Sequence, residues 1–249
     1  MNQANDRRVA TPVLAAGIIA ITLVSGCEKF EAREVMATVF FARGNAVAGD
    51  GQQISKKSHP IAVGSSIPVG NQIQTSRDTV VALSLIPGIS IEVESETDLG
   101  IEHLRIAKDG DAMVDAMRSG FALIRLKNGV IRASLLQMGS SRCEFQVQTK
   151  QGTVIARPGA IFSLRADAET LRVICLRGET SWRDSHDSSF HQIPAGYYRD
   201  YTSGRAGSLL IALEDPRVAE EAVAALDTAS FLESLELLAR NAPAPWRHR

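Results

Sequence analysis

Turn-forming residues recur at short intervals through most of the chain, and the runs between them are short and apolar. Between positions 36 and 201, glycine, asparagine, aspartate and proline interrupt runs in which apolar and polar side chains alternate. Residues 37–41 and 46–47, on either side of an Arg43-Gly44-Asn45 turn, show this pattern. Short alternating runs between turn signals are typical of β-strands. The sequence therefore predicts an all-β core, arranged as a β-solenoid or as a sandwich-like domain.

The two runs that flank Pro87-Gly88 constrain how their strands can pair. A two-residue hairpin there would pair Leu85 with Ser90 and so set a serine against a core residue. Pro-Gly also favours a type II turn, whose twist does not suit a two-residue hairpin. We therefore expect either a loop of odd length that pairs Leu85 with Ile91, or a corner that takes the chain to another sheet.

The sequence also suggests the local structure of two further segments, around Asn128-Gly129 and at 104–118. Asn128-Gly129 is a turn signal between the apolar runs 121–126 and 130–133, so we expect it to separate two strands. Residues 104–118 fit either a loop or one or two helical turns that Asp111 would cap.

The pattern changes from strands to helices at Asp215-Pro216. Aspartate is a good N-cap and proline suits the first helical position, which predicts a helix over 216–226. The capping-box pattern that begins at Ser230 predicts a second short helix, ending at about Arg240. Both helices have an apolar stripe, by which they either pack on the β domain or bind a partner.

The first segment has the features of a lipoprotein signal peptide. Arg7 and Arg8 precede an apolar stretch at 13–24, which is too short to cross a bilayer as an ordinary helix. The stretch runs into Val24-Ser25-Gly26-Cys27, which resembles a bacterial lipobox. An ordinary signal peptide with a chance cysteine, or an uncleaved anchor helix, are the alternatives. We interpret residues 1–26 as a signal peptide that is removed.

Lipidation of Cys27 would decide where the protein is located. A thiolate is a strong nucleophile, so the Cys27 sulfur suits the acceptance of diacylglycerol, and acyl chains would then anchor the protein to the membrane. By resemblance to sorted lipoproteins, Glu28 favours the outer over the inner membrane, with the protein facing the periplasm. We expect a lipidated tether over 27–35, a β domain over 36–204 and a helical segment over 205–249.

Two further cysteines and an aromatic cluster leave alternatives open. Cys143 and Cys175 lie on apolar strand faces, in what would be an oxidising compartment. They form a disulfide if their strands are neighbours, and are otherwise buried thiols. The cluster of Trp182, Tyr197, Tyr198 and Tyr201 is either part of the core or a patch that faces a ligand.

Charge and motifs argue against two classes of function. With 27 basic and 28 acidic residues and 5% aromatics, the chain has neither the basic face nor the stacking residues of a nucleic-acid-binding protein. It also lacks the G-x-S-x-G, P-loop and H-E-x-x-H patterns. His186 and His191 are weak metal candidates whose spacing matches no standard zinc pattern, so a solvated loop is expected there. We predict no enzyme activity and no cofactor.

Several short segments resemble the periplasmic FecR-type domain of the ferric-citrate regulator family. The segments, in chain order, are 69–75, Pro87-Gly88, 145–149, 158–164 and 176–180. Asn71, Pro87, Pro158 and Ala160 replace residues that are typical of the family at those positions. The matched positions are turn glycines and core apolar residues, so the resemblance implies the fold of the family more than an activity.

The resemblance leads to two hypotheses about function. The first is a non-enzymatic envelope lipoprotein whose FecR-like domain binds or scaffolds a protein or glycan partner. The alternative is an envelope signalling regulator of the FecR sigma-control type. Regulators of this family use a cytosolic segment and a membrane span, and only about a dozen residues precede the apolar stretch here. We therefore expect the transmembrane signalling role not to carry over.

Overall fold

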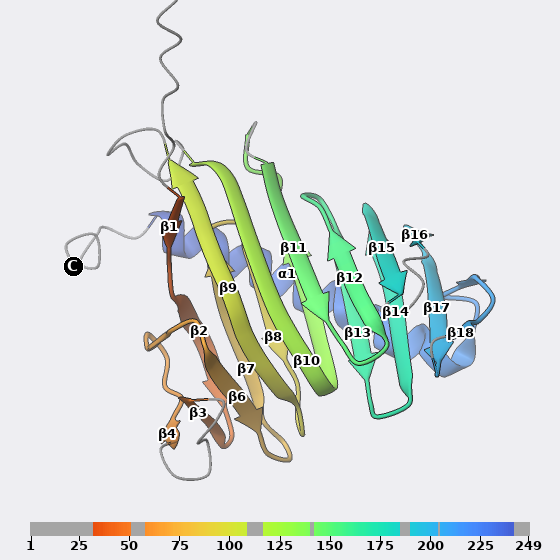
Figure 1. Cartoon of the computed structure of the whole chain (residues 1–249), viewed down its shortest axis with the longest axis horizontal. Helices are drawn as coiled ribbons and strands as arrows, with labels where there is room; N and C mark the ends of the chain where they lie inside the picture. The colour runs from red at the N-terminus through yellow and green to blue at the C-terminus, as the bar shows by residue number, and fades with distance from the viewer. Residues whose placement is uncertain are drawn as a thin grey trace, which may run out of the picture.

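The computed structural model describes residues 32–50, 58–108, 117–139, 142–184, 190–203 and 205–241. Within these residues the chain forms two β-sheets, A and B, followed by one long helix (Figure 1). Cys27 and the predicted signal peptide lie outside the described residues, as do positions 109–116 of the ambiguous segment. On either side of that gap the chain is strand rather than helix.

Sheet A forms the front layer in Figure 1. In hydrogen-bonded order it contains β4 (Ser58–Pro60), β3 (Ala46–Asp50), β6 (Asn71–Thr75), β9 (Asp98–Lys108), β10 (Met117–Leu135), β11 (Arg142–Gln148), β12 (Gly152–Ala156), β15 (Glu179–Asp184) and β16 (Phe190–Pro194). The short strand β1 (Ala32–Glu34) pairs with the end of β9. β10 and β11 are parallel, and the other described pairs in this sheet are antiparallel.

Sheet B lies behind sheet A and is antiparallel throughout the described pairs. Its order is β5 (Ser66–Ile67), β2 (Ala37–Arg43), β7 (Val80–Ile86), β8 (Ile89–Val93), β10, β13 (Ile161–Ala166), β14 (Thr170–Arg177) and β17 (Tyr197–Thr202), with β18 (Arg205–Ala206) and β19 (Leu210–Ile211) paired to β17. The all-β core that the sequence predicts is confirmed. The strands extend beyond the predicted β domain, from position 32 to 211.

The expectation that Asn128-Gly129 separates two strands is wrong, because β10 continues through it. The residues up to Asn128 pair with β9 in sheet A, and those from Gly129 onward pair with β13 in sheet B. Gly129 has a φ of 103° and passes so close to Thr97 that a Cβ at position 129 would lie 2.2 Å from Thr97 Oγ1. Glycine is needed here to carry one strand from sheet to sheet, not to reverse the chain.

The register expected around Pro87-Gly88 is also wrong. β7 and β8 form a hairpin with a two-residue loop, in which Ile86 faces Ile89 and Ser84 faces Ser90. Leu85 lies at a register shift between these two pairs, and Gly88 has a φ of 87°. An extra residue in one strand restores the in-and-out alternation, so the apolar residues of both strands still share one face.

Apolar side chains of both sheets form the core between them. Phe145 of sheet A and Phe162 of sheet B are fully buried, with ring centroids 5.9 Å apart. Trp182 of sheet A stacks on Tyr201 of sheet B at 4.0 Å, and both are fully buried. Tyr198 is also buried, on the opposite face of sheet B against the helix. Trp182, Tyr198 and Tyr201, three members of the aromatic cluster seen in the sequence, are therefore packing residues.

A single helix, α1 (Pro216–Asn241), replaces the two short helices that the sequence predicts. It begins as expected, with the Asp215 carboxylate accepting a hydrogen bond from the Arg217 backbone N–H at 2.9 Å. Ser230 does not cap a second helix. Its hydroxyl donates to the Leu226 carbonyl one turn earlier, as a serine does in a helix interior. No glycine or proline interrupts residues 226–230, so the helix continues.

Helix α1 lies on the outer face of sheet B and forms a third layer (Figure 1). It contacts β8, β10, β13 and β14, and its face toward the sheet is buried. The buried helical residues are Val218, Ala222, Ala225, Thr228, Ala229, Leu232 and Glu236. Of the two roles expected for the apolar stripes, packing on the β domain is the one the structure shows. No helix in the described part of the chain is long and apolar enough to cross a bilayer.

Cys143 and Cys175 are both buried and are not bridged to each other, since Cys175 is a free thiol. Cys143 lies on β11, whose neighbours are β10 and β12, while Cys175 lies on β14, between β13 and β17. The condition for the disulfide, that the two strands are neighbours, is not met. Burial raises the pKa of the Cys175 thiol, which keeps it in the unreactive protonated form.

Candidate functional site

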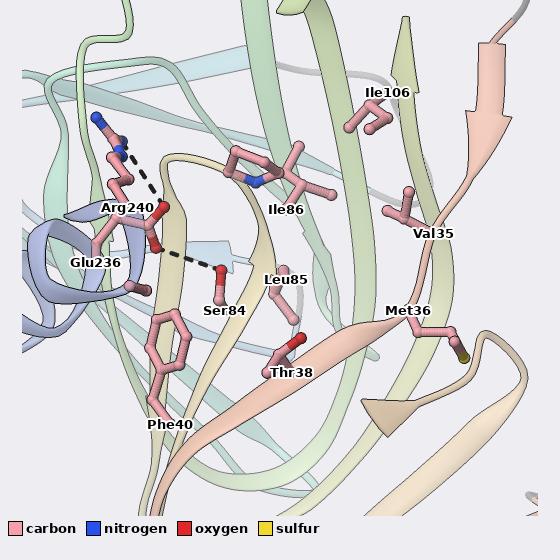
Figure 2. Close-up of a pocket in the computed structure, with 12 residues that line it drawn as sticks. Val35, Met36, Thr38, Phe40, Ser84, Leu85, Ile86, Ile106, Glu236 and Arg240 are labelled. Carbon is pink, nitrogen blue, oxygen red and sulfur yellow. Dashed lines mark hydrogen bonds and ion pairs between the residues drawn. The ribbon is translucent and has the colours of Figure 1, made fainter. Parts of the chain in front are cut away.

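A pocket of about 260 Å³ lies between the C-terminal end of α1 and the strands next to it (Figure 2). Segments far apart in the sequence form it: the residues that lead into β2 and its start, the end of β7 with the turn after it, one residue of β9, and the last turns of the helix. The lining residues are Val35, Met36, Thr38, Phe40, Ser84, Leu85, Ile86, Pro87, Ile106, Glu236, Ala239 and Arg240.

Most of the pocket wall is apolar. Ile86 and Ile106 are buried, and the Met36 side chain is 56% exposed. The chain enters the fold at this end of the molecule, where β1 leads into β2 (Figure 1). Val35 is only eight residues after Cys27, a length of chain that spans at most about 28 Å when fully extended. A membrane anchor at Cys27 would therefore hold this pocket close to the bilayer surface.

One end of the pocket carries a buried carboxylate, that of Glu236. Its Oε1 accepts a hydrogen bond from the Gly88 backbone N–H at 3.0 Å. Its Oε2 accepts bonds from the hydroxyls of Ser90 at 3.0 Å and Ser84 at 3.3 Å. The side chain is only 6% exposed, so these three donors replace most of the water that a carboxylate would otherwise bind. The turn of the β7–β8 hairpin is thereby tied to the helix.

Arg240 lies one helical turn after Glu236 and completes this polar end. Its Nη2 is 3.7 Å from Glu236 Oε1 (Figure 2). The same nitrogen also contacts the Met138 sulfur. Both charged groups of the pocket are thus engaged with groups of the protein itself. The remaining surface is apolar and suits a partner that contributes apolar side chains.

The size of the pocket narrows the kind of ligand that it fits. Pockets for drug-sized ligands and cofactors are typically about 300–1,000 Å³ and enclose most of the ligand. A volume of about 260 Å³ is smaller, and it opens at an exposed end of the molecule. Hot spots of protein interfaces are apolar anchor side chains that fill pockets of this kind. In size, the pocket matches one or two apolar side chains better than a drug-sized ligand.

The other end of α1 is held by a cluster of Asp215, Arg217 and Tyr198. The Arg217 guanidinium and the Tyr198 hydroxyl both bond the Asp215 carboxylate, and they hold its pKa well below the usual range. The same carboxylate raises the pKa of Arg217. Burial, followed by the bond to Asp215, raises the pKa of Tyr198. The helix is therefore fixed to the sheet at its beginning as well as at its end.

His191, Cys143 and Cys175, the described residues that the sequence singled out for chemistry, are not among the residues that line this pocket. His186 is outside the described residues. His191 packs beside Trp182, at 5.4 Å between ring centroids, and its Nδ1 lies 3.0 Å from Arg199 Nη1. In the described ranges, no group of three histidine, cysteine, aspartate or glutamate side chains is placed to hold a metal ion. No local sequence pattern predicts the pocket, because its lining residues lie up to 205 positions apart in the chain, from Val35 to Arg240.

Comparisons with known proteins give distant structural matches, including the following two. Two crystal structures of a "putative anti-sigma factor" from Parabacteroides distasonis ATCC 8503 each align with 56% of this chain, at a TM-score of 0.40. Sequence identity is 14% for one and 15% for the other, and 57% of the matched chain is covered in each case. No protein-family model and no curated protein matches the chain. At this level of similarity, neither structure informs the function of the chain.

Proposed function

We propose that the chain is a non-enzymatic, lipid-anchored protein of the cell envelope that binds a partner protein at the pocket beside Glu236. The pocket is the observation that carries the proposal. Its wall is mostly apolar, it is smaller than a typical ligand pocket, and it includes the exposed Met36. A protein that inserts apolar side chains is the partner such a surface fits.

The place of the pocket in the chain supports an envelope partner. Val35 and Met36 line it, and the lipobox-like Cys27 lies less than ten residues earlier. Acyl chains on Cys27 would confine the pocket to a layer near the membrane surface. A partner that is itself held at the membrane would then meet the pocket at a high effective concentration.

Lipidation can be tested independently of binding. Cells that express the wild-type chain or Cys27→Ser are labelled with radioactive palmitate and then fractionated. We expect the label and the membrane association in the wild type, and neither in the variant. An unlabelled wild-type protein with residues 1–26 still attached would contradict the anchor.

Binding at the pocket can be mapped by photo-crosslinking in cells. A photo-reactive residue at Met36, 56% exposed at the pocket, is compared with one at Phe190, which is 55% exposed on β16 at the other side of sheet A (Figure 1). We expect a discrete protein adduct at position 36 and none at position 190. The same set of background adducts at both positions would contradict the proposal.

The second candidate is an envelope signalling regulator of the FecR type. The glycines of the FecR-like segments, Gly70, Gly88, Gly159 and Gly178, have φ values of 86°, 87°, 90° and 70°, so each stands where the backbone favours glycine. This favours the family's architecture for these segments. The regulator would need an uncleaved N-terminus in the cytosol. Detection of residues 1–26 on the mature protein, protected from protease outside the cell membrane, would favour this candidate over the first.

A further inference from the structure

Four arginines surround a second hollow, far from the pocket beside Glu236. It lies between the first turns of α1 and the outer face of sheet B, and has a volume of about 400 Å³. We call it the arginine hollow. Its lining residues are Arg132 of β10, Arg165 of β13, Arg172 of β14, and Arg217, Glu220, Glu221 and Ala224 of α1. The lining residues include four arginines and two glutamates, and four further carboxylates, those of Glu92, Glu94, Asp200 and Asp215, pair with the arginines.

The strand register brings like charges together. Arg165 and Arg172 are directly opposite each other on β13 and β14. Arg132 lies on the next strand, where its neighbour Val130 pairs with Arg165. Like charges directly opposite on adjacent strands destabilise a sheet. Carboxylates of the protein itself offset this repulsion, since Arg165 is paired with Glu221 and Arg172 with Asp200.

Carboxylates of the protein bond each of the four arginines and hold the guanidinium groups in place. Arg132 Nη1 bonds Glu92 at 2.9 Å and also bonds Glu94. Arg172 Nε bonds Asp200 at 2.7 Å, which raises the pKa of Arg172. Arg165 Nε bonds Glu221 at 3.2 Å, and Arg217 bonds Asp215.

These ion pairs use only part of the donor capacity, since each guanidinium has five N–H donors. Arg132 Nε is buried and has no hydrogen-bond partner among the described residues. A buried donor in this state is stabilised by a ligand that accepts its hydrogen bond.

We propose that the arginine hollow binds a phosphate group. The planar fork of arginine matches the oxygens of phosphate, and several forks converge here on one space large enough for the group. The phosphate could be a free ion or the headgroup of a lipid, and the chemistry of recognition is the same for both. The inference does not rest on the binding of a protein at the pocket beside Glu236.

The test is calorimetric titration of inorganic phosphate into the full-length protein in detergent. We expect saturable binding, weakened about tenfold by Arg165→Gln, which corresponds to about 1.4 kcal/mol. Arg172→Lys keeps the charge but removes the fork, and should also weaken binding. The matched control is Arg125→Gln, because Arg125 is 52% exposed and paired to Glu102 on sheet A, much as Arg165 is 51% exposed and paired to Glu221.

The titrations distinguish a free phosphate ion from a lipid headgroup as the ligand, and they test whether the site binds phosphate at all. Tighter binding of dihexanoyl phosphatidic acid than of inorganic phosphate would support the site and point to a lipid headgroup, and the reverse order would support the site with a free ion. Binding of neither at about 10 mM would overturn the proposal. Equal weakening by Arg165→Gln and Arg125→Gln would also overturn it, since the effect would then be one of net charge. Thermal unfolding of each variant shows that the comparison is made on folded protein.

Discussion

The Glu236 carboxylate on α1 accepts a hydrogen bond from the backbone N–H of Gly88, 148 residues earlier in the chain. Gly88 stands at the tip of the β7–β8 hairpin, and the hydroxyls of Ser84 and Ser90, which face each other across that hairpin, bond the same carboxylate. In the sequence, these serines argue against a simple hairpin register. In the structure, both of them form hydrogen bonds with the helix. They lie on the outer face of sheet B, where α1 covers them.

Replacing Glu236 should destabilise the protein strongly. Glu236→Ala leaves a backbone N–H, two hydroxyls and a guanidinium without their acceptor in a buried place. We expect a loss of about 3 kcal/mol in the free energy of unfolding, measured by urea denaturation. The exposed Glu214 provides the control, for which Glu214→Ala should change the free energy by less than about 0.5 kcal/mol. A similar small change for both variants would contradict the role of Glu236.

A second prediction concerns the strand that crosses between the sheets. In Gly129→Ala, the new methyl group would meet Thr97 Oγ1 at 2.2 Å and Thr97 Cα at 2.5 Å, at a φ of 103°. Gly196→Ala has an unfavourable φ of 85° but nothing within 4 Å of the methyl group. We expect a loss of about 3 kcal/mol for position 129 against about 1 kcal/mol for position 196. Equal losses in urea denaturation would mean that the close approach to Thr97 is absent.

A third prediction distinguishes one helix from two. Inside a continuous helix, alanine is favoured over serine, so Ser230→Ala should leave stability unchanged or raise it by up to about 0.5 kcal/mol. If Ser230 instead capped a second helix, the same change would cost about 1 kcal/mol. Asp215→Ala removes the N-cap of α1 and should lower the melting temperature. A drop for Ser230→Ala of the same size as for Asp215→Ala would indicate two helices.

The charge of Asp215 gives a prediction about pH. Its pKa is lower in the folded protein than the ordinary value of 3.8, so its charge stabilises the fold above that pH. As the pH falls through the lowered folded pKa, the carboxylate is protonated and this stabilisation is lost. Asp215→Asn keeps a good N-cap but has no charge, so it isolates the effect.

The wild type should therefore melt at a higher temperature than Asp215→Asn at pH 7, and the difference should shrink as the pH falls below 3.8 toward about 2. Added salt should also reduce it, because the pair with Arg217 is partly exposed. A difference that stays constant over this pH range would show that the charge of Asp215 does not contribute.

Short sequence patterns correctly predict those features of the fold that depend on a few neighbouring residues. Alternation and turn residues identify the β core, and Asp215-Pro216 marks the first turn of α1, because both depend on a few neighbouring residues. Asn128-Gly129 misleads for the same reason. The dipeptide favours a turn locally, but the contacts of Gly129 with Thr97 and the pairing of β10 in both sheets keep the chain extended.

The pocket and the arginine hollow could not be predicted in this way. Glu236 is an ordinary helical glutamate in the sequence, and its role appears only when α1 is laid across sheet B. Arg165 and Arg172 become neighbours through the β13–β14 register, and Arg132 and Arg217 join them from β10 and α1, which are distant in the sequence. Sites that depend on long-range pairing leave no local pattern to read.

The most direct test of the proposed binding site is to fill the pocket and measure the crosslink at Met36. Thr38→Phe places a larger side chain at the wall of the pocket, while Thr153→Phe makes the same change on β12 of sheet A as a control. Both proteins are checked for unchanged thermal unfolding. The account predicts that the position-36 adduct is lost in Thr38→Phe and retained in Thr153→Phe. An adduct of undiminished yield in the folded Thr38→Phe protein would contradict it.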